Sequence, residues 1–396
     1  MKKIIPIISI LFFLTGCPKY DCNCDIPEPS GKTETPAIKP IVELQQAEYD
    51  ELEGWKADNM AEAIPAFIAN CSKIKNIKTE YLDKSEIKIS TTNYQAVCKK
   101  LLTADIDTSE KFRRFIEDNF NPYLVLNNGD ANGKFTSYYE AQIHASMTKH
   151  NKYKYPVYGK PDNLMEINLQ DFDKSLPNRR IVGRIAGQKM IPYYTRADIE
   201  NIEFNAPVLM WADSLIDIHI MQIQGSAVAI MDNGEKFRIG YADNNGHSFR
   251  GIGGILLSKG LLEPGKANMI NIKNWLKENP EKAVKNMQEN NRFIFHRIID
   301  GDGPIGAYGL ALIPGRSMAV DRDIIPLGSV LWLNTNTPDK KPLQKLMAAQ
   351  DVGSAIKGAV RGDYFWGSGG DDILELAGGM NSQGQYFILI PKEQRQ

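Results

Sequence analysis

The sequence predicts a mainly β protein with helices, of the α+β class, and three observations support this prediction. Strand-like segments gather in two blocks, from about Asn127 to Lys259 and after Asn290, with Gly-rich turns between the segments. Helical periodicity is confined to the N-terminal part and to two segments between the β blocks. No βαβαβ alternation occurs, which argues against a doubly wound parallel sheet. Many short strands with such turns are typical of a small barrel or sandwich.

The chain begins like a bacterial lipoprotein precursor. Lys2 and Lys3 precede an apolar run over residues 4–14, which is shorter than the ~20 residues that span a bilayer and fits a secretory signal peptide. The motif LTGC, ending at Cys17, is similar to the lipobox in which the cysteine carries the lipid; an ordinary cleaved signal is the alternative. Pro18 follows in place of aspartate, so we expect an outer-membrane anchor facing the periplasm of a Gram-negative bacterium.

The composition excludes some classes of partner and site. The net charge is −1, so no basic bias points to nucleic acid. The length beyond the signal peptide favours two domains. The five histidines are scattered and no His-Glu-x-x-His spacing occurs, so no metal is expected.

The other cysteines fall in two settings. Residues 18–40 are rich in Pro, Ser, Thr and charge and are expected to form a flexible tether. They contain Cys22 and Cys24, whose partners stay open. Cys71 and Cys98 lie in helical-looking sequence, and an oxidising periplasm favours a disulfide between them.

Helices are expected from Val42 to about Tyr123. In AEAIPAFIANCSKI the apolar residues recur every three or four positions, and VCKKLLTADI belongs to another helix. The segment TSEKFRRFIEDNF offers Thr108 or Ser109 as an N-cap before a stripe of four apolar residues. We interpret these apolar stripes as core.

Strands follow from about Asn127, where NNGDANGKFTSYYEAQIHAS begins with turn residues and continues with alternating β-type residues. Asp232-Asn233-Gly234 between two alternating runs predicts a hairpin. Two helices are expected, IGGILLSKG, ended by Gly260, and NIKNWLKENPEKAVKNMQEN. The other expected strands are KYPVYG, PVLMWAD, IDIHIMQIQGSAVAIM, KFRIGYAD, RFIFHRII, SMAV, SVLWLN, KLMAAQDV and QYFILI.

Two aspartates in the stretch AAQDVGSAIKGAVRGDYFWGSGGDD are the main candidates for chemistry. Asp351 ends a strand candidate, and Gly353, Gly358 and Gly362 are expected to let a loop fold back so that Asp363 points into a groove. The aromatic residues after Asp363 should exclude water and raise the pKa of its carboxyl towards that of a general acid. The alternative is that both aspartates cap turns.

The same stretch carries a resemblance to a known family. SMAVDRDIIPLGSVLWL followed by AAQDVGSAIKGAVRGDYFWGSG resembles the three-aspartate domain, whose acids would be Asp321, Asp351 and Asp363. Over residues 45–390 the chain resembles the membrane-bound lytic murein transglycosylase A family. The segments that carry this likeness are LEGWKADN, AFIANC, FRRFIEDNFNPYLV, FTSYYEAQIHAS, YPVYGKPDNL, PYYTRADIE, IHIMQIQGSA, GYADNNGHSFRGIGG and GLALIPGRSMAVD.

The resemblance implies a double-ψ β-barrel catalytic domain with a second, inserted small β-barrel domain. The catalytic domain would comprise residues 41–140 and 289–396, with the three-aspartate region at 300–393. The insert would be residues 141–288. A groove between the two domains would hold the glycan strand.

The resemblance also implies a reaction. The enzyme would be a peptidoglycan lytic exotransglycosylase, a carbon–oxygen lyase that needs no cofactor, although the residues do not distinguish cutting at strand ends from cutting within strands. It would cleave the β-1,4 bond between N-acetylmuramic acid and N-acetylglucosamine and form 1,6-anhydromuramyl ends. Its role would be cell-wall turnover, growth and division. The implied partners are peptidoglycan glycan strands and, through the lipid anchor, the outer membrane; penicillin-binding proteins and scaffold proteins are candidate protein partners.

Site residues follow from the same resemblance. Asp363 would be the single catalytic acid, Asp351 a supporting acid that orients it or its loop, and Asp321 an organiser of the barrel. Asn245, Gly246 and His247 could bind or be structural. Ala227 and Ser354 replace commoner glycines, which leaves room for an altered subsite or loop. The expected glycan contacts are Thr136, Tyr138, Tyr139, Gln224, Gly225, Ser226, Phe365 and Trp366.

Two other functions stay open from sequence. The first is a glycan hydrolase that uses Asp351 and Asp363 as an acid pair with water as the nucleophile. The second is a lipoprotein that binds murein and scaffolds other enzymes without catalysis.

Overall fold

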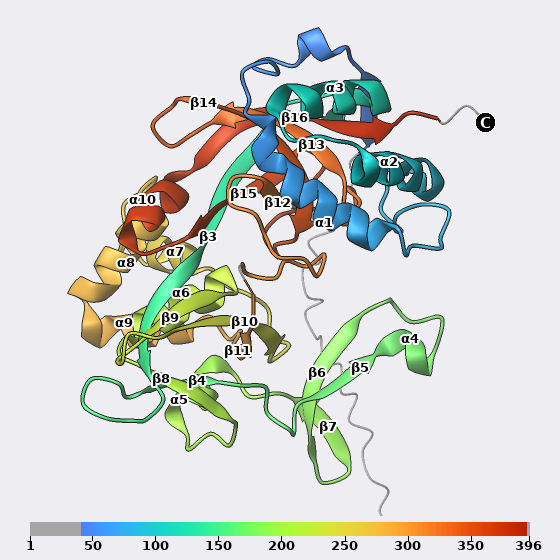
Figure 1. Cartoon of the computed structure of the whole chain (residues 1–396). Helices are drawn as coiled ribbons and strands as arrows, with labels where there is room; N and C mark the ends of the chain where they lie inside the picture. The colour runs from blue at the N-terminus through green and yellow to red at the C-terminus, as the bar shows by residue number, and fades with distance from the viewer. Residues whose placement is uncertain (1–40, 302, 394–396) are drawn as a thin grey trace, which may run out of the picture. The chain divides into compact units, whose positions relative to one another are not determined.

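The computed structural model describes residues 41–301 and 303–393 (Figure 1). The signal peptide 1–17 with Cys17, and the tether 18–40 with Cys22 and Cys24, lie outside these ranges. The described chain mixes strands and helices, with a 13-stranded and a 3-stranded sheet. The α+β class predicted from sequence is therefore confirmed.

The helices and strands alternate irregularly along the chain. The α-helices are α1 (Ile64–Ile74), α2 (Thr91–Thr103), α3 (Ser109–Asn119), α4 (Leu169–Phe172), α5 (Arg196–Asn201), α6 (Leu215–Gln224), α7 (Ile252–Ser258), α8 (Met269–Glu278), α9 (Pro280–Gln288) and α10 (Asp371–Gly379). The strands are β1 (Val42–Gln46), β2 (Phe120–Asn127), β3 (Gly133–Ser146), β4 (Tyr155–Tyr158), β5 (Met165–Asn168), β6 (Arg180–Ala186), β7 (Lys189–Pro192), β8 (Val208–Ala212), β9 (Ala227–Met231), β10 (Lys236–Asn244), β11 (Ile294–Ile299), β12 (Ser317–Val320), β13 (Val330–Asn336), β14 (Pro342–Asp351), β15 (Arg361–Ser368) and β16 (Asn381–Pro391).

The N-terminal helices form where the apolar periodicity predicts them. Thr108 caps α3, because its side chain accepts a hydrogen bond from the Lys111 N–H at 3.3 Å. Phe112 and Ile116 on this helix are fully buried, as expected for core positions. Helices α1 and α2 are joined by a disulfide between Cys71 and Cys98, whose Cα atoms lie 5.2 Å apart.

Two sequence-based expectations about secondary structure are wrong. Residues 42–46 and 120–127 are not helical but form the antiparallel pair β1 and β2, because Phe120 already ends α3 in an extended conformation. The segment IDIHIMQIQ is not a strand but helix α6. Ser214 caps its start by accepting from the Asp217 N–H, and Gly225 ends it at φ +91°. The isoleucines of this segment recur at every second position, as in a strand, although the segment forms a buried helix.

The long strand β3 belongs to two sets of strands. Its first half pairs with β15 in parallel and with β16 antiparallel. Its second half, from Ala141, pairs with β9 in parallel, and β9 continues to β10 through the predicted hairpin, where Gly234 has φ +87°. In Figure 1, β3 runs as one continuous strand from the labels of β15 to those of β8 and β9.

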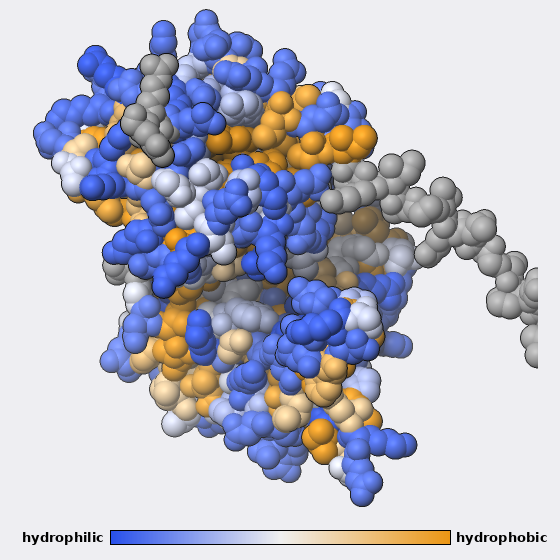
Figure 2. Space-filling model, turned by 90° about the vertical axis from the view of Figure 1, so that its right-hand side faces the viewer, coloured by the Kyte–Doolittle hydropathy of each residue, from blue (hydrophilic) through white to orange (hydrophobic). Residues whose placement is uncertain are grey.

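The described residues, 41–301 and 303–393, belong to one compact unit. Its main apolar core packs α1–α3 against strands β12–β16 around the fully buried Trp332. A second core lies around β3, β9 and α6. Figure 2 shows one face of the molecule, on which hydrophilic residues prevail and apolar residues form smaller patches. The division at about Glu140 and Glu289 into a barrel domain and an insert stays a prediction.

Candidate active site

Two aspartates and a threonine lie in one row across four neighbouring strands. Ala319 on β12 is the register partner of both Asp351 on β14 and Asp363 on β15. Thr136 on β3 is the partner of Asp363 on its other side. Side chains of register partners project on the same face of a sheet, so this row, which we call the acid row, gathers residues more than 200 positions apart.

The expected loop folds back over residues 352–360, between β14 and β15, which run in opposite directions. Asp363 itself lies just after this loop, within strand β15. β15 pairs with strands on both sides, which fixes the direction of the Asp363 side chain more firmly than a loop would. A methyl group at Gly362 would come within 3.0 Å of the Phe135 ring. This glycine is therefore needed for close strand packing rather than for a turn.

The carboxyl group of Asp363 is half-buried and has one fixed partner. The Thr136 hydroxyl donates a hydrogen bond to its Oδ1, and Arg361 donates to the same Thr136 oxygen at 2.7 Å. Among residues 41–301 and 303–393, none donates a hydrogen bond to Oδ2. Burial raises the pKa of Asp363 to about 6, against the lowering effects of the Thr136 hydrogen bond and the Arg361 charge.

Asp351, in contrast, has its oxygens occupied. Oδ1 accepts from the backbone N–H groups of Ala307 and Val352, both at 2.9 Å, and Oδ2 accepts from the Tyr138 hydroxyl at 2.8 Å. Burial raises the pKa of Asp351, and these three donors oppose the rise. The pKa of Tyr138 is raised by burial and by the neighbouring Asp351 charge, so its hydroxyl stays protonated and able to donate.

Asp321 stands just beyond β12, outside the acid row. It is 5% exposed and accepts from Lys357 Nζ at 3.0 Å and from the Gly358 N–H at 2.9 Å. Gly358 has φ +115°, a conformation that favours glycine. Asp321 thus holds the segment that leads into β15 and reaches Asp363 only through that segment.

The aromatic residues after Asp363 are packed rather than open. Phe365 is 1% exposed, and its ring centre lies 5.1 Å from that of Tyr138. Trp366 is half-buried and packs against Tyr364, with ring centres 4.9 Å apart. Phe365 shares the face of Asp363 and adds an apolar surface beside Tyr138, whereas Tyr364 and Trp366 point to the other face of β15. Stacking of Phe365 or Trp366 on a sugar stays a prediction.

The QIQGS segment is brought to β3 but not to Asp363. Gln224 Oε1 accepts from the Tyr139 N–H at 3.3 Å, Gly225 ends α6, and Ser226 is half-buried. Ala227 is fully buried in β9 and Ser354 is exposed. Direct sugar contact by these residues stays a prediction.

The segment with Asn245 and His247 is tied to the protein interior. The Asn245 amide donates to the carbonyls of Tyr194 and Asn291, both at 2.8 Å. The His247 ring nitrogen Nε2 lies 2.8 Å from the Tyr193 carbonyl oxygen. These bonds favour the structural alternative for this segment.

Glu140 on β3 is one of the buried acids that sequence reasoning missed. It is fully buried, and both its oxygens lie within 3.2 Å of Arg238 Nε. Ser368 donates to it as well, and Arg238 also donates to the Gly301 carbonyl at 2.6 Å. Burial raises the pKa of Glu140, and the Ser368 hydrogen bond and the Arg238 charge partly oppose this rise. Glu140 therefore ties β3 to the end of β15, to β10 and to the segment after β11.

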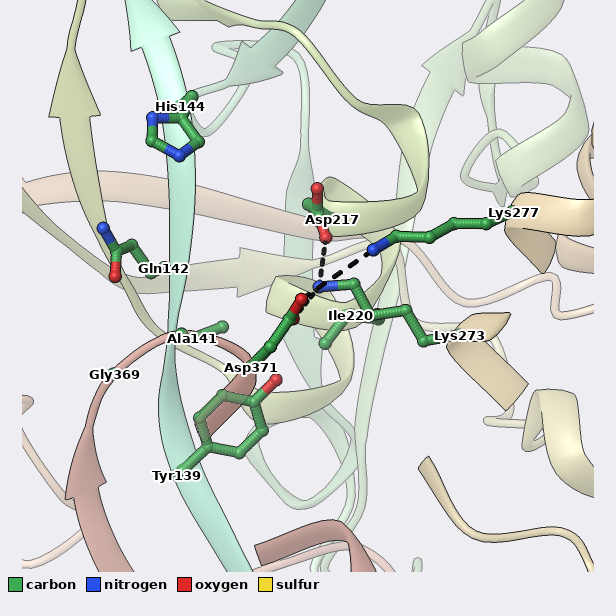
Figure 3. A pocket seen from close by; sticks show the side chains of 11 residues that line it. Tyr139, Ala141, Gln142, His144, Asp217, Ile220, Lys273, Lys277, Gly369 and Asp371 are labelled. Carbon is green, nitrogen blue, oxygen red and sulfur yellow. Dashed lines mark hydrogen bonds and ion pairs between the residues drawn. The ribbon is translucent and has the colours of Figure 1, made fainter. Parts of the chain in front are cut away.

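A cavity lies close to this region but does not contain the acid row. It has a volume of about 310 Å³ and is lined by β3, α6, α8 and the start of α10 (Figure 3). Tyr139 opens into this cavity, and contact of Tyr139 with glycan stays a prediction. Its lining residues are Tyr139, Ala141, Gln142, His144, Asp217, Ile220, Lys273, Lys277, Gly369, Gly370 and Asp371.

In the part of the chain that the structure describes, no three His, Cys, Asp or Glu side chains gather as metal ligands would. Over the same described ranges, no helix has both the length and the apolar character needed to cross a bilayer.

Comparison with known proteins identifies close relatives. The model of the MltA specific insert domain matches residues 134–297, and that of the 3D domain matches residues 316–390. A membrane-bound lytic murein transglycosylase A homolog from Buchnera aphidicola is 30% identical over 336 residues, which cover 80% of this chain and 84% of the relative.

Solved structures give the same result. The crystal structure of MltA from Neisseria gonorrhoeae superimposes with a TM-score of 0.77 at 31% identity, covering 90% of this chain and 96% of that one. A membrane-bound lytic murein transglycosylase from Agrobacterium tumefaciens gives a TM-score of 0.78 at 29% identity, with 88% and 97% coverage.

Proposed function

Since the chain belongs to the membrane-bound lytic murein transglycosylase A family, we propose that Asp363 is the single catalytic acid with which it cleaves peptidoglycan. The protein is a lytic transglycosylase of peptidoglycan, a lyase. The bond cleaved is the β-1,4 linkage between N-acetylmuramic acid and N-acetylglucosamine. The products carry 1,6-anhydromuramyl ends.

The raised pKa of the Asp363 carboxyl, together with its one unbonded oxygen, is the observation that carries this proposal. A pKa of about 6 leaves part of the population protonated near neutral pH, as a general acid requires. Thr136 fixes Oδ1 and leaves Oδ2 open to a ligand. One oriented carboxyl with one open oxygen suits a reaction in which the same group first gives and then takes a proton.

The proposed steps balance with this one group. Asp363 gives its proton to the glycosidic oxygen as the bond from muramyl C1 to that oxygen breaks. The muramyl C6 hydroxyl then attacks C1, and the Asp363 carboxylate takes the hydroxyl proton. The new C1–O6 bond closes the 1,6-anhydro ring, Asp363 ends as it began, and no water is consumed.

The contacts of Asp351 support a positioning role. A hydrolase of two carboxylates needs the second one free to attack or to activate water. Three donors already occupy the Asp351 oxygens. We assign Asp351 to holding Tyr138 and the segment at Ala307, and Asp321 to holding the segment before β15.

The family also bears on location. Relatives are named membrane-bound enzymes, and the LTGC motif supports an outer-membrane lipoprotein anchored through Cys17 and facing the periplasm. Peptidoglycan glycan strands are its substrate. Penicillin-binding proteins and scaffold proteins are candidate partners, and the role is cell-wall turnover, growth and division.

The test separates catalysis from binding. The mature protein and its Asp363→Asn variant are incubated with purified sacculi, and released muropeptides and pelleted protein are both measured. We expect the variant to pellet with sacculi and to release nothing. Equal release by both proteins would remove Asp363 from catalysis, and release by neither would favour the scaffold function.

A further inference from the structure

Tyr139, which lines the cavity, lies on the opposite face of β3 from the acid row. Successive residues of a strand point to opposite faces. Thr136 and Tyr138 point to Asp363 and Asp351. Ser137 points the other way, since its hydroxyl donates to the Ala377 carbonyl of α10 at 2.9 Å. Tyr139 and Ala141 share that second face, whereas Gln142 and His144 lie on the face of Tyr138, so the cavity is lined from both faces of β3 and contains neither Asp351 nor Asp363.

Two polar groups that line this cavity form no hydrogen bond with any residue that the structure describes. The Tyr139 side chain is 4% exposed, yet no described residue forms a hydrogen bond with its hydroxyl, which Figure 3 shows turned into the cavity. The Gln142 amide is equally unpaired within the described ranges and lines the same space. The Tyr139 hydroxyl is not among the side-chain atoms sealed in the protein without a partner, so it reaches the open space of the cavity and is free to bond a ligand there.

The charges of the cavity balance one another. Lys273 forms ion pairs with Asp217 and with Asp371, both at 2.9 Å. Lys277 lies 3.9 Å from Asp371. Two lysines and two aspartates leave no net charge to attract an anion or a cation. The pKa of Tyr139 is raised to about 12 by burial, so its hydroxyl is neutral and both donates and accepts.

These features suit a neutral ligand rich in hydrogen-bonding groups. The free groups, a tyrosine hydroxyl and a glutamine amide, each donate and accept. Ala141 and Ile220 supply an apolar part of the wall. The volume of about 310 Å³ is at the small end of ligand sites, which span roughly 300–1,000 Å³. A sugar ring with hydroxyl groups, an acetamido group and C–H surfaces has the matching chemistry.

We propose that this cavity is a second sugar site, which binds one N-acetylhexosamine unit of a glycan strand away from the catalytic acid. The proposal rests on the proposed function, because murein supplies such units. The second site would bind a glycan strand at a point that does not include Asp363.

The test uses the mature protein with the Asp363→Asn change, which removes turnover. Tri-N-acetylchitotriose is titrated by calorimetry, and hydrogen–deuterium exchange locates the protected segments. We expect protection of residues 139–144 and 273–277 besides the acid row. Tyr139→Phe and Gln142→Leu should each weaken binding at the second site at least tenfold and leave the first within twofold. Lys282→Met, an exposed change on neighbouring α9, is the matched control.

Two outcomes would overturn the proposal. One is protection confined to the acid row with binding unaffected by either variant. The other is that a sugar-free murein peptide binds the cavity and chitotriose does not, which would make it a peptide site. Neither outcome affects the proposed function, which is judged separately from the products that the wild-type protein releases from sacculi.

Discussion

Thr136 and Asp363 are register partners on the parallel strands β3 and β15, and the threonine hydroxyl donates a hydrogen bond to Asp363 Oδ1. Arg361 donates to the same hydroxyl oxygen at 2.7 Å. Asp363 is therefore oriented by a neutral hydroxyl donor. The charged Arg361 side chain bonds to Thr136 and not to the Asp363 carboxyl. A direct ion pair would hold the carboxyl deprotonated more strongly.

The pH dependence of kcat should follow the protonation of Asp363, which Thr136 influences through its hydrogen bond. The catalytic form is the protonated carboxyl, so kcat should fall as the pH rises through about 6. In Thr136→Val the hydrogen bond that stabilises the carboxylate is lost, the pKa of Asp363 rises, and the falling limb should move to higher pH. The rate should also drop on the order of tenfold, since a hydrogen bond contributes ~1–1.5 kcal/mol. The measurement is a kcat profile from pH 4 to 9, with Thr136→Ser as the control that keeps the hydroxyl. If kcat fell over the same pH range in Thr136→Val and in Thr136→Ser, the assignment of Asp363 as the catalytic acid held by Thr136 would be contradicted.

Asp351→Asn should slow the reaction without abolishing it. The amide cannot accept from all three donors, so Tyr138 and the Ala307 segment lose a charged partner. Hydrogen bonds to charged groups contribute ~1.5–3 kcal/mol, which corresponds to a fall in kcat on the order of 10–100-fold. Release of anhydromuropeptides from sacculi is the assay, with Asp363→Asn as the inactive reference. Complete loss of turnover, equal to that of Asp363→Asn, would favour the hydrolase with two acids.

Arg238→Met should destabilise the protein strongly. Glu140 is fully buried, and removal of its cation leaves an unpaired buried charge, which costs about 3–5 kcal/mol. Urea unfolding measures the change. The double variant Glu140→Gln/Arg238→Met should recover part of the loss, because no buried charge remains. Equal instability of the single and double variants would show that the ion pair is not the cause.

Two buried histidines should make the fold sensitive to acid. His219 and His296 are each 1% exposed, and burial lowers their pKa values, that of His296 to about 3. Their neutral forms are favoured in the folded state, so stability should fall as the pH drops from ~6.5, the ordinary pKa of histidine, towards 3. His296 contributes a slope of ~1.4 kcal/mol per pH unit in that window, and His219 acts in the same direction below ~6.5. The free energy of unfolding of His296→Leu should vary less with pH than that of the wild type; parallel curves would contradict this account.

Much of the fold could be predicted because local patterns agree with it. The stripe of α3 and its Thr108 cap, and the Asp232-Asn233-Gly234 hairpin, are complete within a few residues of sequence. The segment of α6 could not be assigned in this way, because its alternating isoleucines fit a strand as well as a buried helix.

The arrangement of the site was also hard to predict, because it depends on contacts between residues that are far apart in the sequence. Gly353 and Gly358 lie in the loop that the sequence suggested, but Gly362 and Asp363 lie in β15, which pairs with a strand on each side. Strand alternation alone could have separated Tyr138 from Tyr139, since adjacent residues face opposite sides. Glu140 gave no signal, because its partner Arg238 is 98 positions away and only the fold brings the two together.

The most direct test of the central claim is digestion of purified sacculi by the mature protein in water enriched in ¹⁸O, followed by mass spectrometry of the released muropeptides. The account predicts products that are lighter than hydrolysed muropeptides by one water and that carry no ¹⁸O, because the muramyl C6 hydroxyl replaces water as the nucleophile. Products with reducing ends and one ¹⁸O atom would show that water attacks C1, and would contradict the single-acid transglycosylase mechanism.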